Sequence, residues 1–383
     1  MVRSVRVALR LDRVLVVAFS LLVAALPARG AEIGPGPGGV CELKLEGPIE
    51  AGDGEKLSSA LSALGSSGGF DSLSVRLCLN SLGGNYDEAL KLMTVLLTHT
   101  NVATVVDAGA ECYSACGFLF LVGNAQASED GELSPNRTLD VRGTLGFHAP
   151  YLQTGTGTDV AAATIENFRR GVSAIAKMLE IDRRGLIPRG LLAKALQVGA
   201  NELLYVDTIE KVGVWSIKLK GYKPPKALTA KMLDQACRNK DMWTNFSHTV
   251  LGRPADDPES LHGLRQSDFP EIRGSDEPIQ LAQGKYHQVL DLFGYEATNV
   301  CVIDVFAKGE NELFLSLSMV LADQPSDQQT SPDPAPFAEQ VMARLNDPQS
   351  LELVSTPLWY VYSPDTALMS LGRPVLEGQA SPR

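Results

Sequence analysis

Short apolar runs with strand character alternate with amphipathic runs of helical spacing along the first half of the chain. The expected strands cover residues 41–47, 74–80 and 102–107, and the expected helices cover residues 56–64, 86–97 and 114–122. Strands that alternate with helices in sequence pair in parallel through right-handed crossovers. This alternation therefore predicts an α/β domain built on a parallel sheet.

The first thirty residues have the composition of a secretory signal peptide. Four arginines precede an apolar run from Val14 to Leu26, and small residues follow Pro27 up to Ala31. This arrangement is typical of a cleaved export signal. The apolar run is shorter than the roughly 20 residues that cross a bilayer as a helix. We therefore expect residues 1–30 to be a signal peptide, with an uncleaved anchor as the alternative.

The charge balance argues against a nucleic-acid-binding protein. The chain has 45 acidic and 34 basic residues, which gives a net charge of −11. Residues 1–30 contain five Arg and one Asp, so removing them leaves 29 basic and 44 acidic residues and a charge of −15. A general nucleic-acid binder needs a positive field that displaces counterions. We therefore expect no nucleic-acid partner.

The chain has six cysteines, all beyond residue 30, and an oxidising compartment makes disulfides the expected state. Six cysteines allow fifteen pairings, so the sequence alone does not choose between them. Cys237 and Cys301 are the two cysteines of the C-terminal half, and we expect this bridge first. Cys112 and Cys116 lack the further ligands of a closed zinc site. No metal is expected.

The composition changes after residues 223–226, where two prolines stand between two lysines. We place a domain boundary there and expect a first domain over residues 31–226. Residues 227–322 are expected to form a smaller α+β unit, closed by the Cys237–Cys301 bridge, which would contribute roughly 3–4 kcal/mol. Residues 323–383 are expected to be a linker and a tail. The residues of this half predict no function.

Three features of the first domain carry chemistry. The segment Asn80-Ser-Leu-Gly-Gly84 ends a strand, and its glycines leave peptide N–H groups free to hold an oxyanion. Ser114 begins an apolar helix, where its hydroxyl could act as a nucleophile. His148 follows a short strand, and a neutral imidazole is the usual base for a serine. Alone, each has a purely structural explanation: a turn, a helix N-cap and a structural histidine.

In their order and spacing, these motifs resemble the proteolytic subunit of the Clp protease and its exported relatives. The resemblance covers residues 40–222 and implies the crotonase-like fold, a stack of ββα units. It also implies that Ser114 is the nucleophile and His148 the base. The oxyanion hole would be formed by the amides of Gly84 and Ala115.

Two departures from the family pattern affect details. Leu82 stands where the family has a proline, and a polar insert over residues 128–144 lengthens the stretch between the serine and the histidine. Neither departure removes a reacting atom.

The third member of the expected triad is not obvious. The family aspartate should fall in the region where this chain has Asn201 and Glu202. We expect Asn201 to orient the histidine through its amide oxygen, with Glu202 and then Asp207 as alternatives. Loss of a carboxylate would weaken such an enzyme without removing its geometry.

The leading expectation is therefore an exported Clp-like serine hydrolase of a bacterial envelope, a peptidase that acts on peptides or unfolded proteins. The family habit implies a homo-oligomer. No Gly-Lys-Ser/Thr phosphate loop occurs, so neither ATP nor another cofactor is expected. One alternative is an inactive Clp-like fold that acts in binding or assembly. Another is a crotonase-type acyl-thioester enzyme, which the presence of both Ser114 and His148 disfavours.

Overall fold

The computed structural model describes residues 30–66, 74–126, 132–149, 160–182, 185–199, 202–247, 272–293, 298–308, 312–321 and 355–372. The expected signal peptide lies outside these residues except for Gly30, and so do residues 323–354 of the expected linker and tail. Among the described helices, none is long and apolar enough to cross a membrane.

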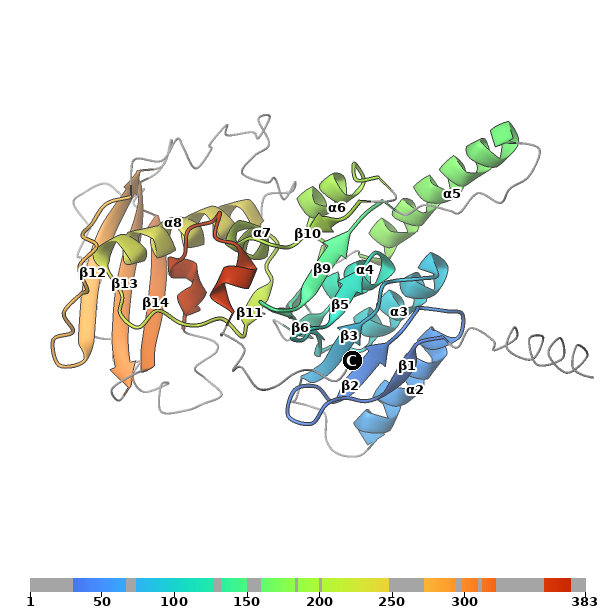
Figure 1. Cartoon of the computed structure of the whole chain (residues 1–383), viewed down its shortest axis with the longest axis horizontal. Helices are drawn as coiled ribbons and strands as arrows, with labels where there is room; N and C mark the ends of the chain where they lie inside the picture. The colour runs from blue at the N-terminus through green and yellow to red at the C-terminus, as the bar shows by residue number, and fades with distance from the viewer. Residues whose placement is uncertain are drawn as a thin grey trace, which may run out of the picture.

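A six-stranded sheet forms the centre of the first half, in the order β1-β2-β3-β4-β8-β11 (Figure 1). Its strands are β1 (Glu32–Pro35), β2 (Leu43–Glu46), β3 (Val75–Asn80), β4 (Val102–Val106), β8 (Arg137–Asp140) and β11 (Lys218–Lys220). Strand β1 is antiparallel to β2, and every other neighbouring pair is parallel. The prediction of an α/β fold with a parallel sheet is confirmed.

Helices α2 (Asp53–Ser66) and α3 (Tyr86–Thr98) make the crossovers between successive strands of this sheet. Helix α3 begins because the Asn85 side chain accepts a hydrogen bond from the Glu88 amide, at 3.1 Å. One face of α3 then buries Leu92 and Leu96 in the core. A third helix, α4 (Ala115–Leu121), is buried along its whole length.

A second, three-stranded sheet continues from the carboxyl edge of the first. It has the order β10-β9-β5, with β5 (Glu111–Tyr113) parallel to β9 (Thr144–Phe147) and β10 (Leu204–Tyr205) antiparallel to β9. A parallel bridge between Ser81 and Cys112 joins the end of β3 to β5. The remaining elements of this half are β6 (Asn124–Gln126), β7 (Leu133–Pro135), α5 (Val160–Ile181), α6 (Arg189–Ala195) and α7 (Ile209–Val214).

The expected polar insert over residues 128–144 is partly wrong. Its described part contains β7 and β8, and β8 is an inner strand of the main sheet. The charged side chain of Arg137 made this segment read as polar, so the sequence did not predict the strand. Arg137 is 1% exposed and donates hydrogen bonds to the carbonyls of Leu121, Leu186, Trp215 and Ser216.

The C-terminal half contains α8 (Ala230–Ser247) and an antiparallel sheet of β12 (Lys285–Phe293), β13 (Thr298–Lys308) and β14 (Glu312–Leu321). A disulfide joins Cys237 of α8 to Cys301 of β13, and both residues are fully buried. The helix is thereby fastened to the middle strand of the sheet.

The expected tail needs a correction over residues 355–372. These residues carry two short 3-10 helices, η2 (Leu358–Val361) and η3 (Leu368–Leu371). They lie between the antiparallel C-terminal sheet and the six-stranded sheet (Figure 1). Thr356 pairs with β14, whereas Ala367 pairs with Thr208 of the first half. Apolar side chains in this stretch, including Trp359, are buried, which explains why it packs instead of forming a solvated tail.

The two halves have distinct cores, and helix α8 contributes side chains to both of them. Helix α8 buries Cys237 in the C-terminal core and Trp243 in the core of the first half. The Trp243 ring lies against α7, since a Cβ atom at Gly213 would come within 2.2 Å of it. Trp243 stacks on Trp359 with ring centroids 5.3 Å apart.

Candidate active site around Ser114

Ser114 lies in the sharp turn between β5 and α4, in a backbone conformation that is rare for a residue with a side chain. Its φ is 57° and its ψ is −122°. Holding a non-glycine residue there costs about 1–3 kcal/mol and persists only when the surroundings impose it. The Ser114 amide donates to the Gly146 carbonyl at 3.0 Å, which ties the turn to β9.

The Ser114 hydroxyl does not cap the helix that it precedes. The side chain makes no capping hydrogen bond, and no other hydrogen bond of the described residues uses this hydroxyl. The ordinary structural explanation for a serine at a helix start therefore does not apply. Strained turns of this kind occur where a reactive side chain is presented at the end of a strand.

The Gly83-Gly84 turn lies directly against the serine. A Cβ atom at Gly83 would be 2.9 Å from the Cβ of Ser114, and a Cβ atom at Gly84 would be 2.3 Å from the Ile49 carbonyl oxygen. Both glycines also have positive φ, 98° and 145°. Only glycines allow this approach, so they bring backbone, rather than side chains, to the Ser114 turn.

The hydrogen bonds of Ile49 determine where the Gly84 amide points. Ile49 donates to the Gly83 carbonyl at 2.9 Å and accepts from the Asn85 amide at 2.8 Å. In a parallel bridge of this kind, the central residue, Gly84, directs its own N–H away from Ile49. No described residue accepts a hydrogen bond from Gly84 or from Ala115, the first residue of α4. Both predicted oxyanion amides are thus without a described acceptor.

Gly117 explains how α4 packs so closely on β9. A Cβ atom at this position would be 2.9 Å from both the Gly146 oxygen and the Phe147 ring. The glycine of the Ser-Ala-Cys-Gly motif therefore lets the helix, and the serine at its start, approach the strand that leads to His148.

His148 follows β9 and is 9% exposed. Residues Tyr113 and Gly146 are paired in the parallel β5–β9 ladder, so Ser114 and His148 leave neighbouring strands at the same edge of the sheet. The Nδ1 atom of His148 is 2.7 Å from the Ala149 carbonyl oxygen. Because a carbonyl only accepts, Nδ1 carries the proton in this contact.

The candidates for the third member differ in position. Asn201 lies outside the described residues. Glu202 is exposed and begins the segment that leads into β10. Asp207 is exposed, forms an ion pair with Lys211 at 2.7 Å, and lies level with the start of β9, whereas His148 follows its end. The structure therefore does not bring Asp207 to the histidine.

The contact between His148 and the Ala149 carbonyl was not predicted from the sequence. No residue type signals it, because every residue carries a carbonyl. Its position depends on the backbone direction after β9.

No family model and no curated protein matches the sequence. One similar solved structure is a mutant of ClpP1 from Listeria monocytogenes, with a TM-score of 0.31 and 13% sequence identity. The match covers 46% of this chain and 90% of that one.

Proposed function

We propose that the protein is a serine hydrolase, and specifically a peptidase that acts on short or unfolded peptides. The observation that carries the proposal is the strained backbone of Ser114, whose hydroxyl is unused by the described residues and lies beside the Gly83-Gly84 turn. Ser114 attacks the carbonyl carbon, and His148 Nε2 takes the hydroxyl proton and returns it to the leaving amine. Water then hydrolyses the acyl-enzyme with the same base.

The amides of Gly84 and Ala115 form the oxyanion hole in this proposal. They donate to the negative oxygen of the tetrahedral intermediate, and loss of one such donor typically costs about 10²–10³ in rate. Because these donors are backbone groups, the hole needs no metal ion. The proposal includes no ATP-dependent step.

Further parts of the proposal concern the fold and the setting of the enzyme. The first half is proposed to be a crotonase-like stack of ββα units, in which α2 and α3 follow strands of the parallel sheet. The protein is proposed to be exported to a bacterial envelope compartment and to form a homo-oligomer. The apolar run of residues 14–26 and the disulfides Cys41–Cys78, Cys112–Cys116 and Cys237–Cys301 support an oxidising location.

A fluorophosphonate probe tests the proposal directly. We expect the purified protein to form one covalent adduct, located on Ser114 by peptide mass spectrometry, because such probes react fast only with an activated serine. Ser114→Ala should remove the adduct. A folded protein that stays unmodified would contradict the hydrolase and favour the binding or assembly alternative.

Asn201 remains the proposed partner that supports His148, since it precedes β10, the strand paired with β9. Asn201→Ala is expected to lower turnover by about tenfold, a moderate loss because the Ala149 carbonyl still fixes the imidazole tautomer. Asn201→Asp is expected to retain or raise turnover, since a carboxylate stabilises the imidazolium. The measurement is kcat on a peptide substrate. Equal kcat in all three proteins would remove Asn201 from the site, and a larger loss in Glu202→Ala would reassign the role.

A further inference from the structure

A disulfide brackets the candidate nucleophile at a distance of two residues on each side. Cys112 belongs to β5, Cys116 belongs to α4, and their sulfur atoms are bonded across the turn that contains Ser114. Both cysteines are fully buried. The bridge closes a loop of only three intervening residues, so it removes little chain entropy compared with a bridge between distant segments. Its position suggests a local role.

The hydrogen bonds around the turn do not already fulfil this local role. On the strand side, the Tyr113 amide donates to the Ser81 carbonyl and the Ser114 amide donates to Gly146, each at 3.0 Å. On the helix side, the Ser114 carbonyl accepts from the Phe118 amide at 3.3 Å. These bonds hold each flank separately. The disulfide adds a covalent link that sets how the start of α4 lies against the end of β5.

The conformation of Ser114 must be imposed by its surroundings, and the disulfide is one of the constraints that flank it. At a φ of 57° the residue is in a sparsely populated backbone region, and it relaxes unless its surroundings forbid this. Relaxation toward negative φ would rotate the Cβ and hydroxyl away from their present direction and move the adjacent Ala115 amide. Both the nucleophile and one oxyanion donor would then be misplaced.

We propose that the Cys112–Cys116 disulfide is a positioning element, which holds Ser114 and the Ala115 amide in their reactive arrangement. This inference rests on the proposed function, because it takes Ser114 as the nucleophile. It deepens that function by making the activity dependent on an oxidised pair that itself touches no substrate. The enzyme would be assembled for catalysis only where this disulfide forms.

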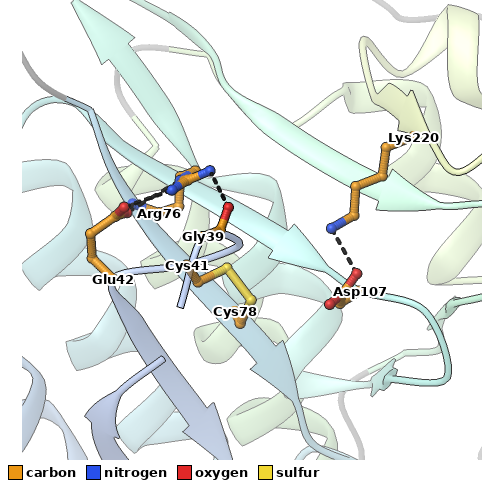
Figure 2. Close-up of a disulfide and its surroundings, with 7 residues drawn as sticks. All are labelled: Gly39, Cys41, Glu42, Arg76, Cys78, Asp107 and Lys220. Atoms are coloured by element: carbon orange, nitrogen blue, oxygen red, sulfur yellow. Dashed lines mark hydrogen bonds and ion pairs between the residues drawn. A yellow bond between two sulfur atoms is a disulfide. The ribbon is translucent and has the colours of Figure 1, made fainter. Parts of the chain in front are cut away.

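The Cys41–Cys78 disulfide supplies a matched control. It joins Cys41, two positions before β2, to Cys78 in β3, and the two cysteines are 37 positions apart in the sequence. Figure 2 shows it between the Glu42–Arg76 pair and the Asp107–Lys220 pair. Its cysteines pack with Val105 in a small cluster apart from the core that contains Cys112 and Cys116. Removing it should affect stability but not the Ser114 turn.

The test compares the double variants Cys112→Ala/Cys116→Ala and Cys41→Ala/Cys78→Ala with the unchanged protein. The rate constant of fluorophosphonate labelling and the final number of adducts per molecule are measured separately. We expect loss of Cys112–Cys116 to lower the rate constant about 10- to 100-fold while the final stoichiometry stays near one, because the serine is present but misplaced. We expect loss of Cys41–Cys78 to lower the Tm by roughly 5–15 °C and to leave the rate constant unchanged.

The outcomes separate the two proposals. If the unchanged protein does not label, the hydrolase itself fails. If it labels and the Cys112/Cys116 variant labels at the same rate, the positioning role is overturned. A purely structural role would lower the Tm and the stoichiometry but not the rate constant of the molecules that react. Should the alanine pair not fold, Cys112→Val/Cys116→Ala fills the strand position and undergoes the same measurement.

Discussion

Replacing His148 by alanine is expected to slow fluorophosphonate labelling of Ser114 by about 10²- to 10⁴-fold. The serine hydroxyl is a poor nucleophile until a base takes its proton, and in the proposed mechanism His148 takes it at Nε2 while its Nδ1 contacts the Ala149 carbonyl. The quantity to compare is the second-order rate constant of labelling, measured for both proteins in the same buffer.

His99 gives the control for this substitution. It is the C-cap residue of α3 and contributes a backbone hydrogen bond to Val95, which alanine retains. His99→Ala should therefore label at the normal rate. If His148→Ala also labelled at the normal rate with its fold intact, the proposed serine–histidine pair would be wrong.

Replacing Arg137 by methionine is expected to lower the free energy of unfolding by about 3–5 kcal/mol. Burial lowers the pKa of Arg137 to about 9, and the guanidinium is held by carbonyl oxygens, two of them at 2.6 Å and one at 2.8 Å. Methionine retains much of the volume, so the loss reports mainly the carbonyls that are left without a donor. Urea denaturation followed by circular dichroism measures it.

The exposed Arg76 provides the comparison for Arg137. It pairs with Glu42 at 2.7 Å, but both side chains are well exposed to solvent. Exposed ion pairs contribute at most about 1 kcal/mol, so Arg76→Met should have a small effect. Similar losses for the two variants would contradict a structural role of the buried arginine.

The parallel strands could be predicted because their apolar runs are local in the sequence. Residues 74–80 and 102–107 form β3 and β4 within one residue at each end. Strand β8 could not be predicted in this way. The charge of Arg137 is compensated by carbonyls up to 79 residues away, and no local pattern reveals that compensation.

In the candidate site, too, the residues could be predicted from the sequence but their geometry could not. Ser114, Gly84 and His148 stand in a recognisable order, so motif and spacing point to them. Their geometry does not follow from spacing, because the direction of the Gly84 amide depends on the hydrogen bonds of Ile49, which lies 35 residues earlier. The cysteine pairing was open for a similar reason: each bridge depends on which elements the fold brings together.

The tryptophans near the junction between the two halves provide an intrinsic fluorescence probe. The chain has three tryptophans, Trp215, Trp243 and Trp359, and all three are buried in the core of the first half, where Trp243 of α8 stacks on Trp359 of the C-terminal turns. Excitation at the red edge of protein absorbance excites tryptophan alone, so the emission reports on the surroundings of these three rings. During denaturation, a shift in the emission maximum would show when these rings become exposed at the junction between the two halves. The rate of covalent labelling would show separately when the Ser114 turn loses its reactive conformation.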